Sequence, residues 1–355
     1  MSHQHTIRNV TVESRDAWNR FLGENYPPIG AFMQTWEWGA FQESLGRKVG
    51  RFFLTDGGEN AAAAFTLVRH SLPLGLSYGY VPRGPVMKKH DAEGEASLGL
   101  LKTIRAWARE NFPRFVFLRL EPPLFSSVAE LGDHGFHIPP YYVQPRHNLA
   151  VALDKTEDEI VQGFHPSTRS NIRRAERRGV TVEMKRMSED DYNQFFLMAR
   201  DTTLRNSGKN TYPSPDYFRS LVKTIPPLTE IYNPEQLSLG IFYGYQYGQP
   251  AAAHFVLFFG KTATYLYGAS FSDRLRSKVS TYLHWAAMRE AKRRGLEYYD
   301  IGGIDEARWP TLTAFKRQFR GNEFHYIGNV DIPLRPAVYH VYNLFRKFRG
   351  GSFGL

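Results

Sequence analysis

Hydrophobic residues along the 355-residue chain form two patterns. Some recur at helical spacing and others form short continuous runs, and together the two patterns predict a mixed α/β fold. Apolar residues three and four positions apart predict helices. Apolar runs that end at glycine or proline predict buried strands. The predicted helices cover residues 16–22, 36–41, 98–111, 167–178 and 279–294. The predicted strands cover residues 50–54, 62–68, 76–81, 115–120, 239–243, 252–259, 263–267 and 298–301.

The helix predicted at 167–178 has clear boundary signals in the sequence. Pro166 precedes it, Ser167 is a suitable N-cap, and Gly179 is a suitable stop.

One strand–turn–strand block occurs twice, at positions that differ by 190 residues throughout. The copies begin at Gly50 and Gly240, turn at Gly57-Gly58 and Gly248, and continue into runs of three alanines. A solenoid would repeat every 20–50 residues or so, so this spacing indicates a duplicated domain. A duplicated fold offers a cleft within or between its halves, where small substrates usually bind.

Chain length also favours two domains. We expect a first domain at 1–148, completed by 320–355, and a second domain at 149–319.

Composition narrows the classes of function. Hydrophobic residues make up 42% of the chain, which is enough for two cores. The net charge of +10 favours polyanionic partners such as nucleic acid, acidic lipid headgroups or phosphorylated substrates, although ordinary basic solubility also explains it. The sequence has no cysteine, so disulfides, thiolate metal sites and a cysteine nucleophile are excluded. The polar start and the lack of a long apolar run predict a soluble, cytoplasmic protein.

Common catalytic motifs are missing from the sequence. It has no G-x-S-x-G elbow, Walker phosphate loop, H-E-x-x-H or C-x-x-C motif, which disfavours hydrolases, ATPases and zinc enzymes. His254 and His284 lie in apolar stretches, and we interpret them as buried core residues rather than metal ligands. No metal and no cofactor is expected.

The strongest candidate site combines a strand end with a lysine that follows it. The strand that contains Asp300 ends in Gly302-Gly303, a turn whose N–H groups could hold a carbonyl or phosphate oxygen. Lys316 lies in one or two helical turns beside Phe315, and helical spacing places it near Arg320. A lysine beside a buried aromatic ring can stabilise the oxyanion that forms when an amine attacks an ester. The alternative is that Lys316 is a surface lysine on an amphipathic turn. The spacing of the residues, taken alone, favours this alternative.

Six segments in order resemble the Fem family of peptidoglycan-bridge aminoacyltransferases, and the likeness extends from Gln34 to Pro333. The resemblance implies two tandem N-acetyltransferase-like (GNAT) domains without the helical-hairpin arm of some members. The segments are Pro82–Val86, Ser167–Val180, Tyr265–Ser270, Tyr282–Ala286, Tyr299–Ile304 and Phe315-Lys316.

The resemblance also implies a reaction. An amino acid would move from aminoacyl-tRNA to an amine on the stem peptide of a peptidoglycan precursor, either a UDP-linked muropeptide or lipid II. The ester is already activated, so no cofactor is needed, and a monomer is expected. Two alternatives remain open: an acyl-CoA-dependent N-acyltransferase of the same fold that acts on a sugar or lipid amine, and a non-catalytic module that binds RNA or a membrane.

Family resemblance assigns roles to individual residues. Lys316 matches the catalytic lysine, and Glu121 matches a strand-end carboxylate that could orient or deprotonate the attacking amine, unless it is a surface turn carboxylate. The basic residue that grips the precursor's diphosphate in some members is missing here, and Arg83 is a candidate for that task. The other expected substrate-binding residues are Tyr217, Tyr265, Tyr267, Gly302, Gly303 and Phe315.

Two basic segments suggest further partners. Arg169, Arg173 and Arg177 recur every four residues on the predicted helix at 167–178, a spacing that suits RNA phosphates or a solvated face. Near the C-terminus, apolar and basic positions predict an amphipathic helix that either rests on the inner face of the plasma membrane or packs on its own domain. Its apolar side consists of Val338, Val341, Phe345 and Phe348, with Arg346, Lys347 and Arg349 nearby.

Overall fold

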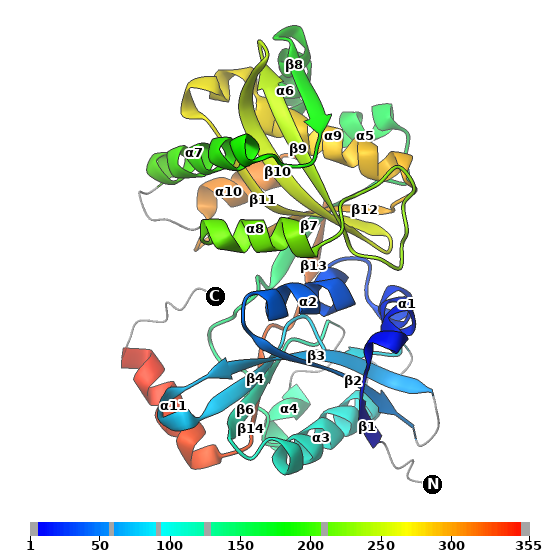
Figure 1. Cartoon of the computed structure of the whole chain (residues 1–355), viewed down its shortest axis with the longest axis vertical. Helices are drawn as coiled ribbons and strands as arrows, with labels where there is room; N and C mark the ends of the chain where they lie inside the picture. The colour runs from blue at the N-terminus through cyan, green and yellow to red at the C-terminus, as the bar shows by residue number, and fades with distance from the viewer. Residues whose placement is uncertain (1–5, 57–59, 90–93, 124–128, 207–211, 349–355) are drawn as a thin grey trace. The chain divides into compact units, whose positions relative to one another are not determined.

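The computed structural model describes residues 6–56, 60–89, 94–123, 129–206 and 212–348. The chain divides into two compact units, each with its own sheet and helices (Figure 1). Unit 1 is Met1–Arg146 with His325–Leu355, and unit 2 is His147–Phe324. These bounds differ by a few residues from those predicted from the sequence. The α/β fold class is as predicted.

Unit 1 contains a mixed sheet in the order β1-β2-β3-β4-β6-β14, with β5 also paired to β3. Strand β14, near the C-terminus, pairs with β6, so the last segment of the chain completes the first unit. Its strands are β1 (Thr6–Asn9), β2 (Lys48–Thr55), β3 (Ala61–Ser71), β4 (Ser77–Val81), β5 (Val86–Met87), β6 (Phe115–Leu120) and β14 (Val330–Pro333). Its helices are α1 (Arg15–Asn25), α2 (Trp36–Ser44), α3 (Gly94–Asn111), α4 (Ala129–Asp133) and α11 (Pro336–Phe348), with 3₁₀ turns at η1 (Val12–Ser14), η2 (Ala31–Gln34) and η3 (Pro73–Gly75).

Unit 2 contains a sheet in the order β13-β7-β12-β11-β10-β9-β8. Helices α7 and α8 cover one face, and α9 covers the other together with α5 and α6 (Figure 1). The strands are β7 (His147–Ala152), β8 (Val180–Met184), β9 (Ser238–Gln246), β10 (Gln249–Phe259), β11 (Thr262–Ser270), β12 (Tyr298–Ile304) and β13 (Asn322–His325). The helices are α5 (Glu157–Gly163), α6 (Pro166–Arg177), α7 (Glu189–Asn206), α8 (Pro215–Thr224), α9 (Val279–Arg293) and α10 (Pro310–Arg317), with a 3₁₀ segment at η5 (Ser272–Ser277).

The sequence repeat corresponds to one antiparallel strand pair in each unit, β2–β3 and β9–β10. In the second copy, Tyr247 and Gly248 both have positive φ, of 53° and 72°. Two central residues with positive φ form the type I′ turn that matches the twist of a hairpin. The first copy's turn at Gly57-Gly58 lies outside the described residues. The predicted strand–turn–strand repeat is otherwise confirmed.

Helix α6 begins one residue earlier than predicted. Pro166 occupies the first helical position, and His165 is the N-cap, with its Nδ1 accepting from the N–H of Ser167 at 3.2 Å. The predicted Ser167 cap is therefore wrong, because a proline has no N–H to be satisfied and fits the first turn well. The predicted stop is confirmed, since Gly179 follows the helix with φ of 65°.

The parallel strand pairs of the two units differ in length. In unit 1, β4 and β6 stay paired as far as Val81 and Leu120. In unit 2, β11 and β12 pair only up to Thr264 and Asp300. Beyond these residues, β11 stays paired with β10, and β12 stays paired with β7. A gap therefore opens between β11 and β12, and backbone polar groups along it need other partners.

Helix α11 packs one side against the sheet of unit 1 and leaves the other side in solvent. Tyr339 is buried, and its hydroxyl donates to Asp331 Oδ2 at 2.8 Å. Val341, Leu344 and Phe345 are exposed. The predicted apolar side is therefore solvent-exposed at Val341 and Phe345. In the described part of the chain, no helix is both long and apolar enough to cross a membrane.

Candidate functional site

Lys316 lies in the gap between β11 and β12. Its side chain is only 6% exposed, and Nζ donates to the carbonyl oxygen of Gly303 at 2.7 Å. Helix α10, which carries it, is fixed to the end of β12 because the N–H of Asp305 donates to Thr313 Oγ1 at 2.9 Å. Lys316 is thus a buried residue at the strand end, and the interpretation as a surface lysine is wrong.

Gly302 makes room for this ammonium group. Its φ is 90°, and a Cβ added there would lie 3.2 Å from Lys316 Nζ and 3.7 Å from the Tyr265 carbonyl oxygen. Glycine is therefore required both by the backbone conformation and by the close approach of Nζ. The Gly302 N–H already donates to Asp300 Oδ1 at 2.8 Å. The expected free amide donor at Gly302 is therefore occupied, and Lys316 supplies a charged donor at this strand end.

Burial and one carboxylate set the charge state of Lys316. Burial lowers the pKa of Lys316 to about 8, and the nearby negative charge of Asp300 opposes that shift. Asp300 itself is fully buried and accepts hydrogen bonds from Asn148 Nδ2 at 3.1 and 3.3 Å. At neutral pH the ammonium is mostly protonated and poorly hydrated. Such a group stabilises a nearby negative charge more strongly than a solvated lysine does.

Two buried histidines lie next to this lysine. The rings of His254 and His284 are 4.4 Å apart between centroids, and His284 Nδ1 is 2.9 Å from the Tyr299 hydroxyl. Burial lowers the pKa of His254 to about 3. Burial, His254 and Lys316 together lower the pKa of His284 well below its usual value. Both are buried as predicted, and their neutral rings leave Lys316 as the positive charge here.

The three predicted tyrosines do not form one cluster. Tyr265 packs on His284 of α9, with ring centroids 4.7 Å apart. Tyr267 packs instead on Phe218 of α8 at 5.0 Å, and its hydroxyl lies 3.2 Å from that of Tyr217. Helices α8 and α9 lie on opposite faces of the sheet (Figure 1). The structure therefore places Tyr265 near Lys316, and Tyr267 with Tyr217 on the other face.

Phe315 helps to hold α10 in place. Its half-buried ring lies 5.6 Å from Phe319 and 5.8 Å from His284, between centroids. Arg320 lies beyond the end of α10, exposed and with φ of 49°. The expected common face of Lys316 and Arg320 is wrong because the helix ends between them.

Glu121 lies in unit 1 and is 3% exposed. Its Oε2 accepts from the Tyr80 hydroxyl at 2.9 Å and the Arg83 N–H at 3.2 Å, and its Oε1 accepts from the Gln144 N–H at 3.1 Å. Burial raises the pKa of Glu121, and the charge of Arg83 opposes the shift. The interpretation as a surface carboxylate is wrong. These contacts give Glu121 the geometry of a residue that fixes the loop at Arg83.

Arg83 is engaged within the same unit. Its guanidinium lies 3.7 Å from the centre of the Tyr326 ring, and Nη2 donates to the Pro145 carbonyl at 2.8 Å. It is 5% exposed, with φ of 51°. Its role as a diphosphate ligand stays a prediction, and binding there would require an exchange of these contacts.

The arginines of α6 divide into two groups. Arg169 is half-buried, and Nη1 donates to the carbonyls of Gln162 and Phe164 at 2.8 and 2.9 Å. Arg173 and Arg177 are exposed, and neither forms an ion pair within the described residues. Arg169 therefore closes the end of α5, while Arg173 and Arg177 offer positive charge to solvent.

Sequence reasoning gave Asp300 no role in the site, missed Asn148, and did not connect the histidines with Lys316. The signal for Asp300 was its place directly before the Gly302-Gly303 turn. Asn148 carries no local signal, because it reaches Asp300 only through the pairing of β7 with β12.

Comparison with known proteins gives matches over most of the chain. The sequence model of the FemAB family matches residues 133–232 and 242–347. Lipid II:glycine glycyltransferase of Staphylococcus epidermidis is 22% identical over 404 aligned residues, which cover 94% of each chain. The crystal structure of FemX superposes with a TM-score of 0.77 at 18% identity, over 95% of this chain and 99% of that one. A tandem GNAT protein from the clavulanic acid biosynthesis pathway gives a TM-score of 0.53 at 10% identity, over 93% and 99%. These structural matches confirm the predicted tandem GNAT-like fold.

Proposed function

Because the chain belongs to the FemAB family, we propose that it is an aminoacyltransferase that extends the stem peptide of a peptidoglycan precursor, with aminoacyl-tRNA as the donor. The observation that carries this proposal is the position of Lys316, a buried ammonium at a strand gap, held by the Gly303 carbonyl. Support for the acceptor comes from the relatives, which are named for glycine transfer to lipid II.

In the proposed reaction, a precursor amine attacks the carbonyl carbon of the aminoacyl ester. A C–N bond forms, the ester C–O bond breaks, and the proton lost by the amine ends on the ribose hydroxyl that leaves. Lys316 donates to the oxyanion in the tetrahedral intermediate, where one such contact typically contributes a factor of about 10²–10³. With no cysteine in the chain, the transfer does not pass through a thioester.

The exposed arginines of α6 support the choice of donor. Arg173 and Arg177 lie one helical turn apart and both face solvent. Lysine and arginine side chains that neutralise phosphates give sequence-independent affinity that falls with salt. We propose that these two side chains contact the phosphates of the tRNA, whereas Arg169 keeps its structural contacts.

The test incubates the protein with a charged tRNA pool and either lipid II or the UDP-linked muropeptide. Mass spectrometry measures whether the precursor gains one aminoacyl residue, with and without RNase. A gain that RNase abolishes supports the proposal and identifies the amino acid. Transfer from an acyl-CoA, with none from charged tRNA, would assign the protein to the other acyltransferase class.

A matched pair of variants links the reaction to the site. We expect Lys316→Ala to lower turnover at least tenfold. Lys292 is the control, because its Nζ also donates to a main-chain carbonyl, that of Leu153 at 3.0 Å, but it lies on α9. Lys292→Ala should leave turnover close to that of the parent, and equal losses in both variants would contradict the assignment.

A further inference from the structure

The exposed side of α11 has no role in the proposed transfer chemistry. Val341 precedes Leu344 and Phe345 by three and four positions, so the three side chains share one face of the helix. They are 51%, 56% and 66% exposed, while Tyr339 on the other side packs on the sheet of unit 1. A surface helix of a globular protein normally buries its apolar residues and turns polar ones to the solvent. In α11 an apolar face stays in solvent.

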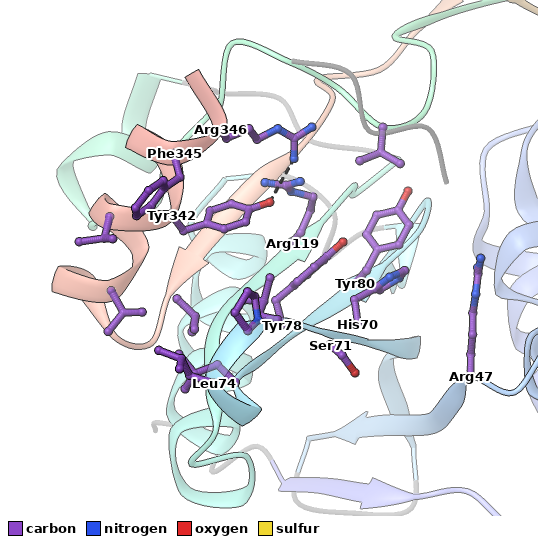
Figure 2. A pocket seen from close by; sticks show the side chains of 17 residues that line it. Arg47, His70, Ser71, Leu74, Tyr78, Tyr80, Arg119, Tyr342, Phe345 and Arg346 are labelled. Atoms are coloured by element: carbon purple, nitrogen blue, oxygen red, sulfur yellow. Dashed lines mark hydrogen bonds between the residues drawn. The ribbon is translucent and has the colours of Figure 1, made fainter. Parts of the chain in front are cut away.

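The turn η3 brings one more exposed apolar side chain to the same place. Leu74 is 96% exposed and has φ of 60°, a left-handed conformation that residues other than glycine rarely adopt. Turns usually carry glycine or a small polar residue at such positions, so neither burial nor turn geometry accounts for a leucine here. Leu74, Val341 and Phe345 line one cavity of about 740 Å³, and Figure 2 shows Leu74 and Phe345 on the same side of it. Together with Leu344, these side chains form the apolar face.

The two segments that form the apolar face contain basic residues but no acidic ones. Neither residues 61–90 nor residues 332–355 include an aspartate or a glutamate. Asp331, directly before the second segment, is fully buried and adds no negative charge to the surface. Arg335, directly before α11, is exposed, and Arg346 on α11 has no carboxylate partner within the described residues. The apolar face is therefore flanked by uncompensated positive charge.

We infer that η3 and α11 dock on the surface of a bilayer that contains anionic phospholipid. The apolar face enters the boundary between headgroups and acyl chains, as interfacial amphipathic helices do, and the basic residues contact the anionic headgroups. A second copy of this chain fits less well, because a symmetric interface would bring the same positive charges together. The inference goes beyond the proposed function, since it concerns the phospholipid surface and not the precursor that is modified.

Vesicle binding tests the docking without any transfer reaction. Co-sedimentation of the full chain would use vesicles of phosphatidylcholine, either alone or mixed equally with phosphatidylglycerol, and all of them free of lipid-linked precursor. We expect the mixed vesicles to bind the protein about tenfold more tightly or better, and we expect added salt to weaken that binding. Equal binding to both kinds of vesicle, or binding to neither, would overturn the inference.

Two matched double variants locate the docking surface. Val341→Ser combined with Phe345→Ser removes two exposed apolar side chains from α11. Leu197→Ser combined with Leu204→Ser removes two side chains of the same exposed fractions, 51% and 66%, from α7 in unit 2. We expect the α11 variant to weaken binding to the mixed vesicles about tenfold or more and the α7 variant to leave it unchanged. Equal losses in the two variants would make the effect one of general surface hydrophobicity and would contradict the docking.

A fluorescent label shows whether η3 itself enters the bilayer. The chain has no cysteine, so Leu74→Cys provides a single thiol for the environment-sensitive fluorophore NBD. Ile231→Cys is the control, because Ile231 is an 87% exposed apolar residue of unit 2. When mixed vesicles are added, NBD emission at position 74 should shift to the blue and gain intensity, because the label leaves water, and emission at position 231 should not change. No change at position 74, or an equal change at both positions, would refute the insertion of η3.

Analytical ultracentrifugation without vesicles distinguishes a bilayer from a second copy of the chain. We expect the parent and the α11 double variant to have the same mass at all protein concentrations. A dimer of the parent that is lost in the α11 variant would make the apolar face a protein interface and would overturn the inference.

The outcome separates this inference from the proposed function. Lys316→Ala should bind mixed vesicles as the parent does, even where transfer is lost. The α11 double variant should slow transfer to lipid II in vesicles and leave transfer to the UDP-linked muropeptide unchanged. If no precursor gains an amino acid but vesicle binding follows the expected pattern, the docking inference stands and the transferase proposal fails. If a precursor gains an amino acid but the protein binds no vesicle, the transferase proposal stands and the docking inference fails.

Discussion

Replacing Lys316 by methionine separates its contribution to catalysis from its contribution to folding. The change removes the ammonium group but keeps an unbranched side chain of similar length in the gap. We expect transfer to fall at least tenfold, because the oxyanion loses its charged donor. We also expect the folded state to be at least as stable as the parent, because a buried charge is removed.

The size of the stability effect follows from two opposing contributions. In the folded protein the pKa of Lys316 is about 8, against an ordinary value of 10.5. That difference corresponds to a cost of about 3 kcal/mol for keeping the buried side chain protonated. The hydrogen bond from Nζ to the Gly303 carbonyl offsets about 1.5–3 kcal/mol of it. At pH 7, Lys316→Met should therefore raise the free energy of unfolding by between zero and about 2 kcal/mol.

The pH dependence gives the sharper test. Between pH 8 and 10.5 the unfolded chain keeps the proton on Lys316 while the folded protein has lost it. Because the unfolded state binds more protons in this interval, the stability of the parent rises with pH. The advantage of the methionine variant should therefore shrink from pH 8 to 10.5. Denaturant unfolding of both proteins at pH 7, 9 and 10 measures this difference.

Catalysis should depend on pH with the opposite sign. In the proposed mechanism the protonated form of Lys316 stabilises the oxyanion, so turnover should fall as pH rises through about 8. An active Lys316→Arg variant should not show this fall, because arginine stays charged. Turnover that rises through pH 8 would indicate that Lys316 acts as a base. A large loss of stability in the methionine variant, equal at every pH, would instead make Lys316 a structural residue.

Three further changes test other parts of the structure. Glu121→Gln keeps one accepting oxygen but replaces the other by an NH₂ group that faces a hydrogen-bond donor, so unit 1 should lose about 1–3 kcal/mol of stability in thermal or denaturant unfolding, and an unchanged midpoint would contradict its buried hydrogen bonding. Asp331→Ala leaves the buried Arg119 without its carboxylate partner and should lower the free energy of unfolding by about 3–5 kcal/mol. A loss below about 1 kcal/mol in denaturant unfolding would show that water reaches the pair. Replacing both Arg173 and Arg177 by glutamine should weaken tRNA binding and reduce the slope of log affinity against log salt by about 2. Lys223→Gln, which removes an exposed lysine on α8, is the control in filter-binding titrations. An equal reduction of tRNA affinity in this variant would show that net charge alone, and not the position of the arginines, determines binding.

The sequence predicted the regular elements well where local signals agreed. The β9–β10 hairpin combines two apolar strands with a turn at Tyr247-Gly248, and both residues adopt the positive φ that such turns need. Helix α6 shows the limit of local signals. Ser167 and His165 are both able to cap, and the choice between them depends on where Pro166 sits in the first turn.

The arrangement of the tyrosines on β11 was harder to predict from the sequence. Alternation along a strand places Tyr265 and Tyr267 on the same face. The structure pairs Tyr265 with Val256 and Tyr267 with Phe255, so Leu266 is the extra residue of a bulge. One extra residue moves every following side chain to the other face. No local composition marks this bulge, and the separation of the two tyrosines could not be predicted from spacing.

The duplication itself explains why the candidate site could be predicted only in part. Equivalent strand pairs in the two units are recognisable in the sequence, yet their ends differ. In unit 1 the strand end is closed, because the N–H of Glu121 donates to the carbonyls of Val81 and Gly84 at 3.2 and 2.8 Å. In unit 2 the two parallel strands are not paired beyond Thr264, and the Lys316 side chain lies in the gap between them. Buried backbone groups must be paired in both units, and unit 2 uses a charged side chain for that purpose. The same fold therefore holds a loop in one unit and a buried ammonium group, the proposed site of charge stabilisation, in the other.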